Sequence, residues 1–226
     1  MKRVSLLVAV LAVAASANAA TVTFSFDTPF KTTDLESAST GGSLSMFDTN
    51  LGNLTGAVLT LRGTLKGTIT LNAGNAGSVD MAGATTSNMN FFSVVPGIKS
   101  LLDAHDPEMA LGYNTGPTLV HLNANDTFTT ALLSSSKSDV LDLSNILGQV
   151  SAAGGGTFAL TCSTSTRLAV GGGISGSSAA QASTASCGAD IVYTYNASTT
   201  NVPEPGSLAL VGLALAGIGF AARRRA

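Results

Sequence analysis

The densest group of side chains that could do chemistry lies at residues 103–108, which read Asp-Ala-His-Asp-Pro-Glu. Three carboxylates and one imidazole within six residues offer oxygen and nitrogen ligands for a divalent metal ion. Their spacing does not follow the Asp-x-Asp-x-Asp-Gly pattern of a calcium-binding loop. We therefore interpret the segment as a solvated turn, with a metal site as the alternative, and we expect neither a bound metal nor a cofactor.

The second histidine, His121, stands between Val120 and Leu122 in an apolar segment. This pattern favours a histidine on the solvated face of a strand over a catalytic base. Serine is abundant, but no serine lies in the Gly-x-Ser-x-Gly motif of a nucleophile elbow. The glycine runs 154–156 and 171–173 lack the spacing of a phosphate-binding loop. The sequence thus predicts a protein that is not an enzyme; an exported hydrolase is the alternative, and it would depend on His105 or His121.

A third candidate is the threonine-rich side of residues 59–71. Leucine and isoleucine take odd positions there, and the even positions hold Thr60, Arg62, Thr64, Lys66, Thr68 and Thr70. Because alternate side chains of a strand point to opposite faces, one face should be buried and the other solvated. An array of hydroxyls on that face could bind ice or a polysaccharide, although an ordinary solvated face is the simpler interpretation. Gly63 and Gly67 fall in the apolar register, so we expect a bulge, bend or hairpin there.

The chain has two cysteines, Cys162 and Cys187. Cys162 ends a predicted strand at 157–162 and Cys187 precedes another at 189–195, with a Gly/Ser/Ala-rich stretch, 163–186, between them. An even cysteine count in an exported protein indicates a disulfide. If the two strands are antiparallel neighbours, both sulfurs lie at the same end of the sheet. A reactive thiol is the alternative, but there is no Cys-x-x-Cys motif and no adjacent basic residue.

Short alternating segments that could position these groups recur along the chain. Predicted strands lie at 21–26, 59–71, 79–81, 119–122, 127–129, 140–143, 157–162 and 189–195, and one helical turn is predicted at 100–104. Many short strands separated by turn residues predict an all-β domain, an antiparallel β-sandwich, over residues 20–196. The polar residues 197–201 form a predicted linker.

The charge of the chain excludes one class of partner. The formal net charge is −2, but five of the eleven basic residues lie at the two termini. Residues 20–201 carry six basic and twelve acidic side chains, a net charge near −6. Phosphate recognition requires clusters of Lys and Arg, so we expect no nucleic-acid partner. The absence of tryptophan and the presence of only three tyrosines also weaken a sugar-stacking site.

The N-terminus reads as a transport signal. Lys2 and Arg3 precede an apolar run at 4–15, and Ala17-Asn18-Ala19 supplies a small-residue cleavage site. These features predict a signal peptide at 1–19 that signal peptidase removes between Ala19 and Ala20. An uncleaved anchor is the alternative, although twelve apolar residues are too few to span a bilayer stably.

The C-terminal segment, residues 202–226, has three features in a fixed order. Val202, Pro203, Glu204 and Pro205 come first, then an uncharged apolar run at 208–222, then Arg223, Arg224 and Arg225. In lipid, backbone amide and carbonyl groups must be hydrogen-bonded within the segment, and an α-helix satisfies this requirement. The apolar run therefore predicts a membrane helix. Its 15 residues are short of the roughly 20 that a full crossing needs. The arginines should stop transfer and stay on the cytoplasmic side of the inner membrane. A buried core helix is the alternative.

This tail resembles the PEP-CTERM sorting signal of Gram-negative bacteria. The resemblance implies export, recognition by a membrane-embedded exosortase, and removal of the tail near the Pro-Glu-Pro motif. Separately, Phe47-Asp48, residues 51–55, the strand at 58–62 and residues 187–195 together resemble the choice-of-anchor type E domain. That resemblance implies a surface or extracellular β domain and adds no chemistry.

These features together predict an exported, non-catalytic envelope or extracellular-matrix protein, anchored transiently in the inner membrane and then placed at the cell surface or outside it. The resemblance to the sorting signal implies a role in biofilm or exopolysaccharide architecture. The alternative from another class is a secreted glycan-binding module, with Asp106, Glu108 or the threonine face as its contacts and an extracellular polysaccharide as its partner.

Overall fold

A computed structural model of the 226-residue chain describes residues 19–32, 40–105, 109–116 and 118–198. The chain is mostly β-strand. Its elements are β1 (Ala19–Asp27), β2 (Lys31–Thr32), β3 (Gly41–Ser45), β4 (Phe47–Asp48), η2 (Thr49–Leu51), β5 (Gly52–Asn72), β6 (Val79–Ser93), α1 (Pro96–His105), β7 (Met109–Asn114), β8 (Val120–Leu122), β9 (Thr127–Thr129), β10 (Leu133–Asp142), η3 (Ser144–Gln149), β11 (Ser151–Ala152), β12 (Thr157–Gly172) and β13 (Ser178–Ala197).

The strands form two curled antiparallel sheets. The first sheet has the order β1-β13-β5-β10, with β2 beside β13 and β9 beside β5; the second has the order β3-β12-β6-β7, with β8 beside β6. β4 and β11 make a separate, short parallel pair. The inward side chains of both sheets belong to one hydrophobic core. The all-β, antiparallel part of the predicted fold class is therefore confirmed.

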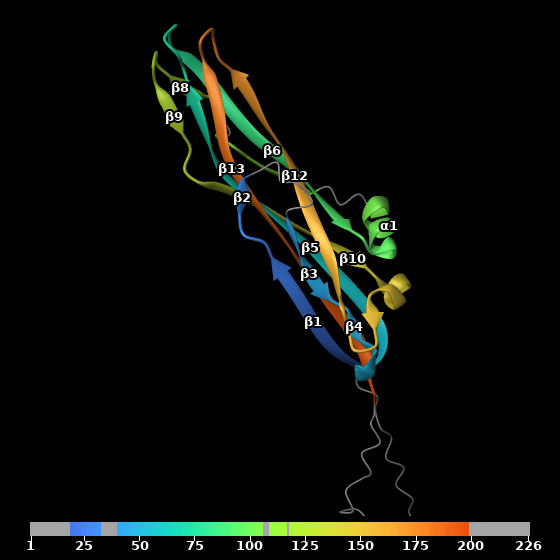
Figure 1. Cartoon of the computed structure of the whole chain (residues 1–226). Coiled ribbons are helices and arrows are strands. Elements are labelled where there is room, and N and C mark those ends of the chain that lie inside the picture. Colours follow the sequence, from blue (N-terminus) through green and yellow to red (C-terminus); the bar gives the residue numbers. More distant parts are fainter. Residues whose placement is uncertain (1–18, 33–39, 106–108, 117, 199–226) are drawn as a thin grey trace, which may run out of the picture.

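Four long strands give the molecule its elongated shape (Figure 1). β5 has 21 residues and β13 has 20, so each spans about 65 Å at about 3.3 Å per residue. The β5–β6 and β12–β13 connections lie together at one pole, which we call the tip, and each carries the chain from one sheet to the other. At the opposite pole, the base, the first residue of β1, Ala19, pairs with Asn196 near the end of β13. Both ends of the described domain therefore leave from the base.

β5 confirms the predicted alternation, but the bend expected at its glycines is wrong. The odd-numbered side chains Leu59, Leu61, Leu65, Ile69 and Leu71 are fully buried, and the strand is continuous from Gly52 to Asn72. A Cβ on Gly63 would lie 2.8 Å from the sulfur of Met89, and one on Gly67 would lie 2.1 Å from the Tyr113 hydroxyl. These glycines therefore admit side chains of the facing sheet, while pairing to β13 and β10 on both sides keeps the strand continuous.

The Gly/Ser/Ala-rich stretch 163–186, in which no strand was predicted, is mostly strand. β12 runs on to Gly172 and β13 begins at Ser178, so only five residues connect them. Similarly, the strand expected at 79–81 extends through β6 to Ser93. The inward positions of these extensions include Thr85, Ser87 and Ser183, all nearly fully buried. Polar residues on both faces remove the hydrophobic alternation from which a strand is recognised.

The predicted disulfide is present and joins the two predicted strands, but these strands are not neighbours in one sheet. Cys162 lies on β12 in the second sheet and Cys187 on β13 in the first, so the bond crosses the core instead of linking neighbours in one sheet. The two Cα atoms are 6.6 Å apart and both side chains are buried. The bond therefore ties the two sheets together near the middle of the long strands.

The single helical turn expected at 100–104 is a ten-residue helix, α1, which begins at Pro96. Proline is favoured in the first helical turn because its missing amide hydrogen has no helical partner there. Ile98 and Leu102 of this helix are buried in the core.

No helix within the described ranges is long and apolar enough to span a membrane. The apolar run 208–222 lies outside those ranges.

Candidate binding face on the outer side of the first sheet

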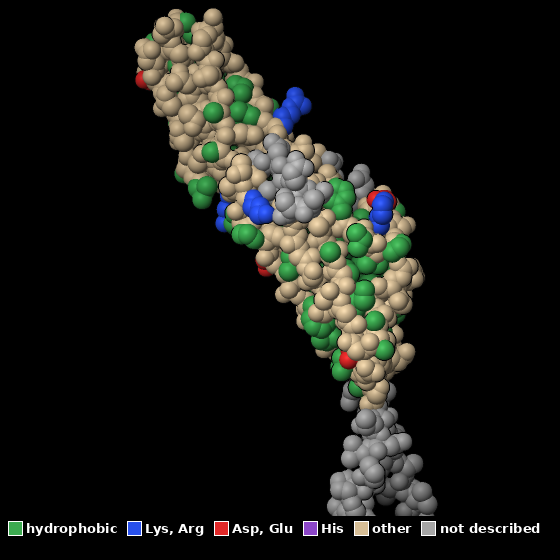
Figure 2. Space-filling view, in the orientation of Figure 1, with side chains coloured by type: hydrophobic (Ala, Val, Ile, Leu, Met, Phe, Trp, Pro, Cys, Tyr) green, Lys and Arg blue, Asp and Glu red, His purple; other side chains and the backbone are tan. Residues whose placement is uncertain are grey.

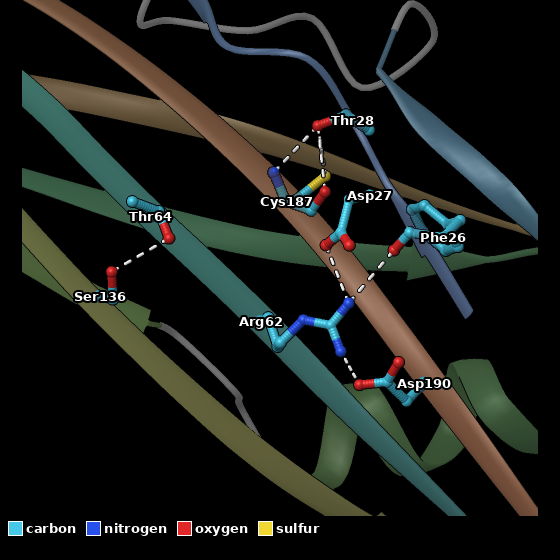
Figure 3. Close-up of polar contacts among 8 residues, drawn as sticks. All are labelled: Phe26, Asp27, Thr28, Arg62, Thr64, Ser136, Cys187 and Asp190. Atoms are coloured by element: carbon cyan, nitrogen blue, oxygen red, sulfur yellow. Dashed lines mark hydrogen bonds and ion pairs between the residues drawn. The ribbon is translucent and has the colours of Figure 1, made fainter. Parts of the chain in front are cut away.

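The outer face of the first sheet carries the even-numbered residues of β5, and Arg62 lies near its centre. The Arg62 guanidinium donates to Asp27 Oδ1 at 2.8 Å and forms an ion pair with Asp190 (Figure 3). A longer contact of 3.5 Å reaches the carbonyl oxygen of Phe26. Arg62 thus connects three strands, because Asp27 ends β1, Asp190 lies on β13 and Arg62 lies on β5.

Gly188 makes this cluster possible. It lies on β13 between Asp27 and Arg62 in the register of the sheet. A Cβ at this position would lie 2.1 Å from Asp27 Oδ1 and 3.1 Å from a guanidinium nitrogen of Arg62. The absent side chain therefore leaves the space through which the guanidinium reaches across one strand to the next.

Hydroxyl groups extend from this cluster toward the tip. Thr64 and Ser136 lie 3.1 Å apart across β5 and β10, as Figure 3 shows. Further along, the Thr70 and Thr129 hydroxyls are 3.1 Å apart, and the Asn72 amide donates to the Thr127 hydroxyl at 3.0 Å. The threonine face predicted from β5 alone is therefore part of a wider array that includes β9 and β10.

A shallow pocket lies beside Arg62. A pocket of about 260 Å³ is lined by Arg62, Gly63, Thr64, Ser136, Lys137 and Ser138. Two residues beyond Thr64, the Lys66 ammonium lies 4.3 Å from the ring centroid of Phe30, a cation–π contact. Phe30 itself is 44% exposed. Figure 2 shows that charged side chains are sparse on the face it draws.

The charges of these groups differ in how far they are compensated. Arg62 has two carboxylate partners, whereas in the part of the chain that the structure describes Lys66 does not lie within ion-pair distance of a carboxylate. Lys137 is paired with Gly63, so its side chain lies on the opposite side of β10 from Ser136. Ammonium and hydroxyl groups at an exposed surface can donate hydrogen bonds to ligand oxygens.

The histidine predicted to lie on a solvated strand face does so. His121, on β8, is exposed, and its Nδ1 lies 2.7 Å from Asp80 Oδ1 on the neighbouring strand β6. Both side chains are more than half exposed. The prediction of a wet-face histidine is confirmed, and its partner Asp80 could be inferred only once the register of the two strands was known.

The segment first considered for metal binding is only partly described. Asp103 pairs with Lys99 at 2.5 Å, one turn earlier on α1, and His105 ends the helix. Asp106 and Glu108 lie outside the described residues. Among the side chains that are described, no three of His, Cys, Asp or Glu lie close enough together to hold a metal ion.

A second hollow lies at the tip. A pocket of about 400 Å³ is lined by backbone and by side chains that include Met81, Val170 and Ile174. The Ser177 hydroxyl donates to the Ile174 carbonyl at 2.7 Å and accepts from the Ile174 amide, which fixes the loop between β12 and β13. The two connections touch there, because a Cβ on Gly74 would lie 2.4 Å from the Gly176 carbonyl oxygen.

Comparison with known protein families finds a match to the PEP-CTERM protein-sorting motif at residues 201–225. The C-terminus carries a PEP-CTERM sorting motif. The motif indicates an exported protein that passes through the membrane and is processed by an exosortase. Val202, Pro203, Glu204 and Pro205 fall inside the match, as do Arg223, Arg224 and Arg225, and all of them lie outside the described residues.

Other comparisons add nothing to this assignment. No curated protein matches the chain. Among solved structures, the mud crab tombus-like virus structure is 8% identical, with 93% of this chain and 97% of that chain covered and a TM-score of 0.17. The T13 IBDV viral particle is 11% identical, with 92% and 50% covered and a TM-score of 0.15. At TM-scores this low, neither similarity carries an argument about fold or function.

Proposed function

We propose that this protein is a non-catalytic component of the cell envelope or extracellular matrix, delivered by the exosortase pathway and contributing to biofilm or exopolysaccharide architecture. The observation that supports the proposal most strongly is the sorting motif at residues 201–225, which follows directly on the β domain. The resemblance of the body to the choice-of-anchor type E domain remains part of this proposal.

The shape of the domain fits such a role. β13 ends at Ala197 at the base, a few residues before the sorting motif. While the tail is in the membrane, the base must therefore stay close to the bilayer. With strands of about 65 Å, the tip and much of the outer sheet face can stand clear of it. An elongated domain tethered at one pole is suited to act as a spacer or to present its far surfaces to a matrix.

Substitution within the motif tests the sorting step. In the native host, we expect Glu204→Ala to keep the tail and remain in the membrane fraction, while the wild-type protein reaches the surface or the medium without it. Glu108→Ala is the matched control, because it removes the same charge from the body. If the wild-type and Glu204→Ala proteins had the same mass and the same distribution between the membrane fraction, the surface and the medium, sorting through this motif would be contradicted.

The matrix role has a separate test. In a strain that lacks the protein, we expect biofilm mass to fall and to recover with the wild-type gene but not with the Glu204→Ala gene. Unchanged biofilm in the deletion strain would contradict the matrix role and leave the sorting step standing.

The second candidate function is glycan binding by the outer face of the first sheet. The observation that favours it is the array of hydrogen-bonded polar side chains from Thr64–Ser136 to Asn72–Thr127, with an exposed aromatic ring, Phe30, in contact with Lys66. On a glycan array, we expect retention of the wild-type domain and weaker retention of Thr64→Val/Ser136→Ala. Thr86→Val, which changes an exposed residue of β6 in the other sheet, should bind as the wild type does. A domain that retains no glycan would exclude this candidate.

A further inference from the structure

We propose that one side of the tip half binds the same side of a second copy of this chain, with the two molecules antiparallel. The tip half is the part of the domain on the tip side of the Cys162–Cys187 disulfide. The side in question, which we call the open side, lies between β12 and β13. This inference goes beyond both functions proposed above and depends on neither.

The open side begins where β12 and β13 lose their outer neighbours. Nearer the base, β1 pairs with β13 and β3 pairs with β12. The neighbours described nearest to the tip are β2, beside Thr184, and the Thr40 carbonyl, which accepts from the Cys162 amide. Farther on, within the described ranges, residues 167–172 of β12 pair only with β6, and residues 178–183 of β13 pair only with β5. The opposite side of the tip half is lined by β8 and β9 (Figure 1).

Apolar side chains are left exposed at the open side. Val170 pairs with the buried Gly83, so its side chain is in the inward register, yet it is 46% exposed. Ile174, in the connection that follows, is 40% exposed. These two residues, with Met81 and Ala179, line the hollow of about 400 Å³ at the tip. An inward valine that stays exposed marks a place where the two sheets lack a covering strand.

The opposite edge of the first sheet shows how an edge of this protein is protected. On the edge strand β10, Lys137 lies opposite the buried Gly63 and is therefore in the inward register. Inward charges on edge strands discourage pairing with another chain. On the open side, residues 167–172 and 178–183 contain no proline and a single charged residue, Arg167. The open side therefore lacks the protection that β10 has.

A second copy supplies what this side lacks. The open side presents two strand edges, one from each sheet, and a single extended peptide can pair with only one of them. An identical open side presents both edges at the same spacing, so one two-fold axis can pair β12 with β12 and β13 with β13. Both pairs are then antiparallel, and each copy covers the exposed Val170 and Ile174 of the other.

The strands nearer the base determine the direction of the partner. There β1 and β3 add one strand to each sheet, so the base projects about 4.8 Å farther than the tip half on this side. Two copies in the same direction would meet at these added strands, which would hold the tip edges apart. In the antiparallel arrangement, the added strands of each copy lie beyond the tip of the other. The bases then stand at opposite ends, so tethered copies can pair only across a gap between two surfaces.

Sedimentation velocity tests the association, with the protein as it is recovered from its native host, between about 1 μM and about 1 mM. Because the paired edges are short, the interface is small, and we expect a reversible dimer that dissociates on dilution. Val170→Asp places an unpartnered carboxylate in this interface and should raise the dissociation constant at least about tenfold.

Two further variants make the test specific. Ile174→Asp, in the connection outside the strands, should weaken the dimer in the same way without altering any paired residue. Val140→Asp makes the same change as Val170→Asp at an exposed valine of β10, and it should dimerise as the wild type does. Circular dichroism and the melting temperature check that all three variants are folded.

Small-angle X-ray scattering measures the direction of the pair. An antiparallel dimer should be about 110 Å long, whereas a parallel dimer should keep the length of the monomer, about 65 Å. A protein that stays monomeric up to about 1 mM would overturn the inference. A dimer that Val170→Asp and Ile174→Asp leave intact, or that Val140→Asp weakens equally, would show that the open side is not the interface. A dimer no longer than the monomer would overturn the antiparallel arrangement.

Discussion

The base and the tip halves of this molecule, divided by the Cys162–Cys187 disulfide, are stabilised differently. In the base half the interior is apolar and aromatic: the Phe47 ring packs against Tyr195 at 5.0 Å and Tyr193 at 5.7 Å between centroids. In the tip half, hydrogen bonds cross between the sheets. Thr85 donates to Gln181 at 2.8 Å, and the Tyr113 and Ser183 hydroxyls are 2.7 Å apart.

This difference shows two ways of extending a β domain. Burying apolar side chains stabilises by roughly 25 cal/mol per Å² of surface removed from water, so the base half can carry most of the stability. A hydrogen bond contributes about 1 kcal/mol net, because the unfolded chain bonds to water instead. The tip half also buries apolar side chains, Leu65, Ile69 and Leu71 among them, and its cross-sheet hydrogen bonds add specific pairing to that packing.

The largest effect should come from a cavity in the base half. Leu59→Ala removes a fully buried side chain and should lower the free energy of unfolding by about 2–5 kcal/mol. Thr60→Ala, at the neighbouring outward position, should change it by less than about 0.5 kcal/mol. Urea denaturation measures both. Similar losses for the two variants would mean that the base core is not the source of stability.

Loss of the disulfide should rank next. The bond closes a loop over a sequence separation of 25 residues, so Cys162→Ala/Cys187→Ala should lower the free energy of unfolding by about 3 kcal/mol. The tip half should be affected most, because the closed loop contains the β12–β13 connection at the tip. Hydrogen exchange resolves the two halves. A reducing agent should bring the wild type close to the variant and leave the variant unchanged; a wild type insensitive to reduction contradicts the prediction.

In the tip half, the cross-sheet pair should behave as a coupled unit. Thr85→Val leaves the Gln181 oxygen without its donor and should cost about 1–2 kcal/mol. Thr85→Val/Gln181→Leu removes both partners and should cost less than the sum of the two single changes. Additive losses in this double-mutant cycle would show that the hydrogen bond contributes nothing to the tip half.

A smaller, pH-dependent effect is expected at the base. Burial raises the pKa of Tyr193 well above its ordinary value of 10.0, and its hydroxyl donates to the Ser45 carbonyl at 2.9 Å. The unfolded chain loses this proton near pH 10 while the folded chain keeps it, so the stability is complete below pH 10 and falls as pH rises. Tyr193→Phe should flatten this decline between about pH 10 and 11. Parallel declines for the two proteins would assign the alkaline sensitivity to other groups.

The smallest effect should come from Asp142. Hydrogen bonds from the Ser144 hydroxyl and amide hold its pKa below its ordinary value of 3.8. This contribution is present above pH 3.8 and disappears as pH falls further. Asp142→Asn should therefore show slightly weaker acid sensitivity, measured by the urea midpoint at neutral and acidic pH. An unchanged midpoint difference would show that Ser144 does not stabilise the ionised carboxylate.

The same contrast explains which parts of the fold the sequence could predict. The buried Leu59, Leu61 and Leu65 alternate with polar residues, and that pattern locates β5 and its two faces. On the tip side of the disulfide, the buried residues Ser87 and Ser183 give no such signal. The parts of β6, β12 and β13 that contain such residues were therefore not predicted. β7 was missed although Met109, Leu111 and Tyr113 alternate inward, and this signal was present in the sequence.

The candidate site was predictable only in part, for a related reason. Arg62 and Lys66 could be placed on the solvated face of β5 from alternation alone. Ser136 joins them only through the register that sets it opposite Thr64, and the sequence of neither strand specifies which distant strand it pairs with. The disulfide was predicted from export and cysteine count, but the sheets it joins depended on the same missing register.

Intact mass spectrometry of the protein recovered from the envelope and the medium of its native host tests the central claim most directly. The account predicts a polypeptide that begins at about residue 20, lacks the residues beyond the Pro-Glu-Pro motif, and gains two hydrogens on reduction. A full 226-residue chain with free thiols, found in the cytosol and absent from the exported fractions, would contradict it.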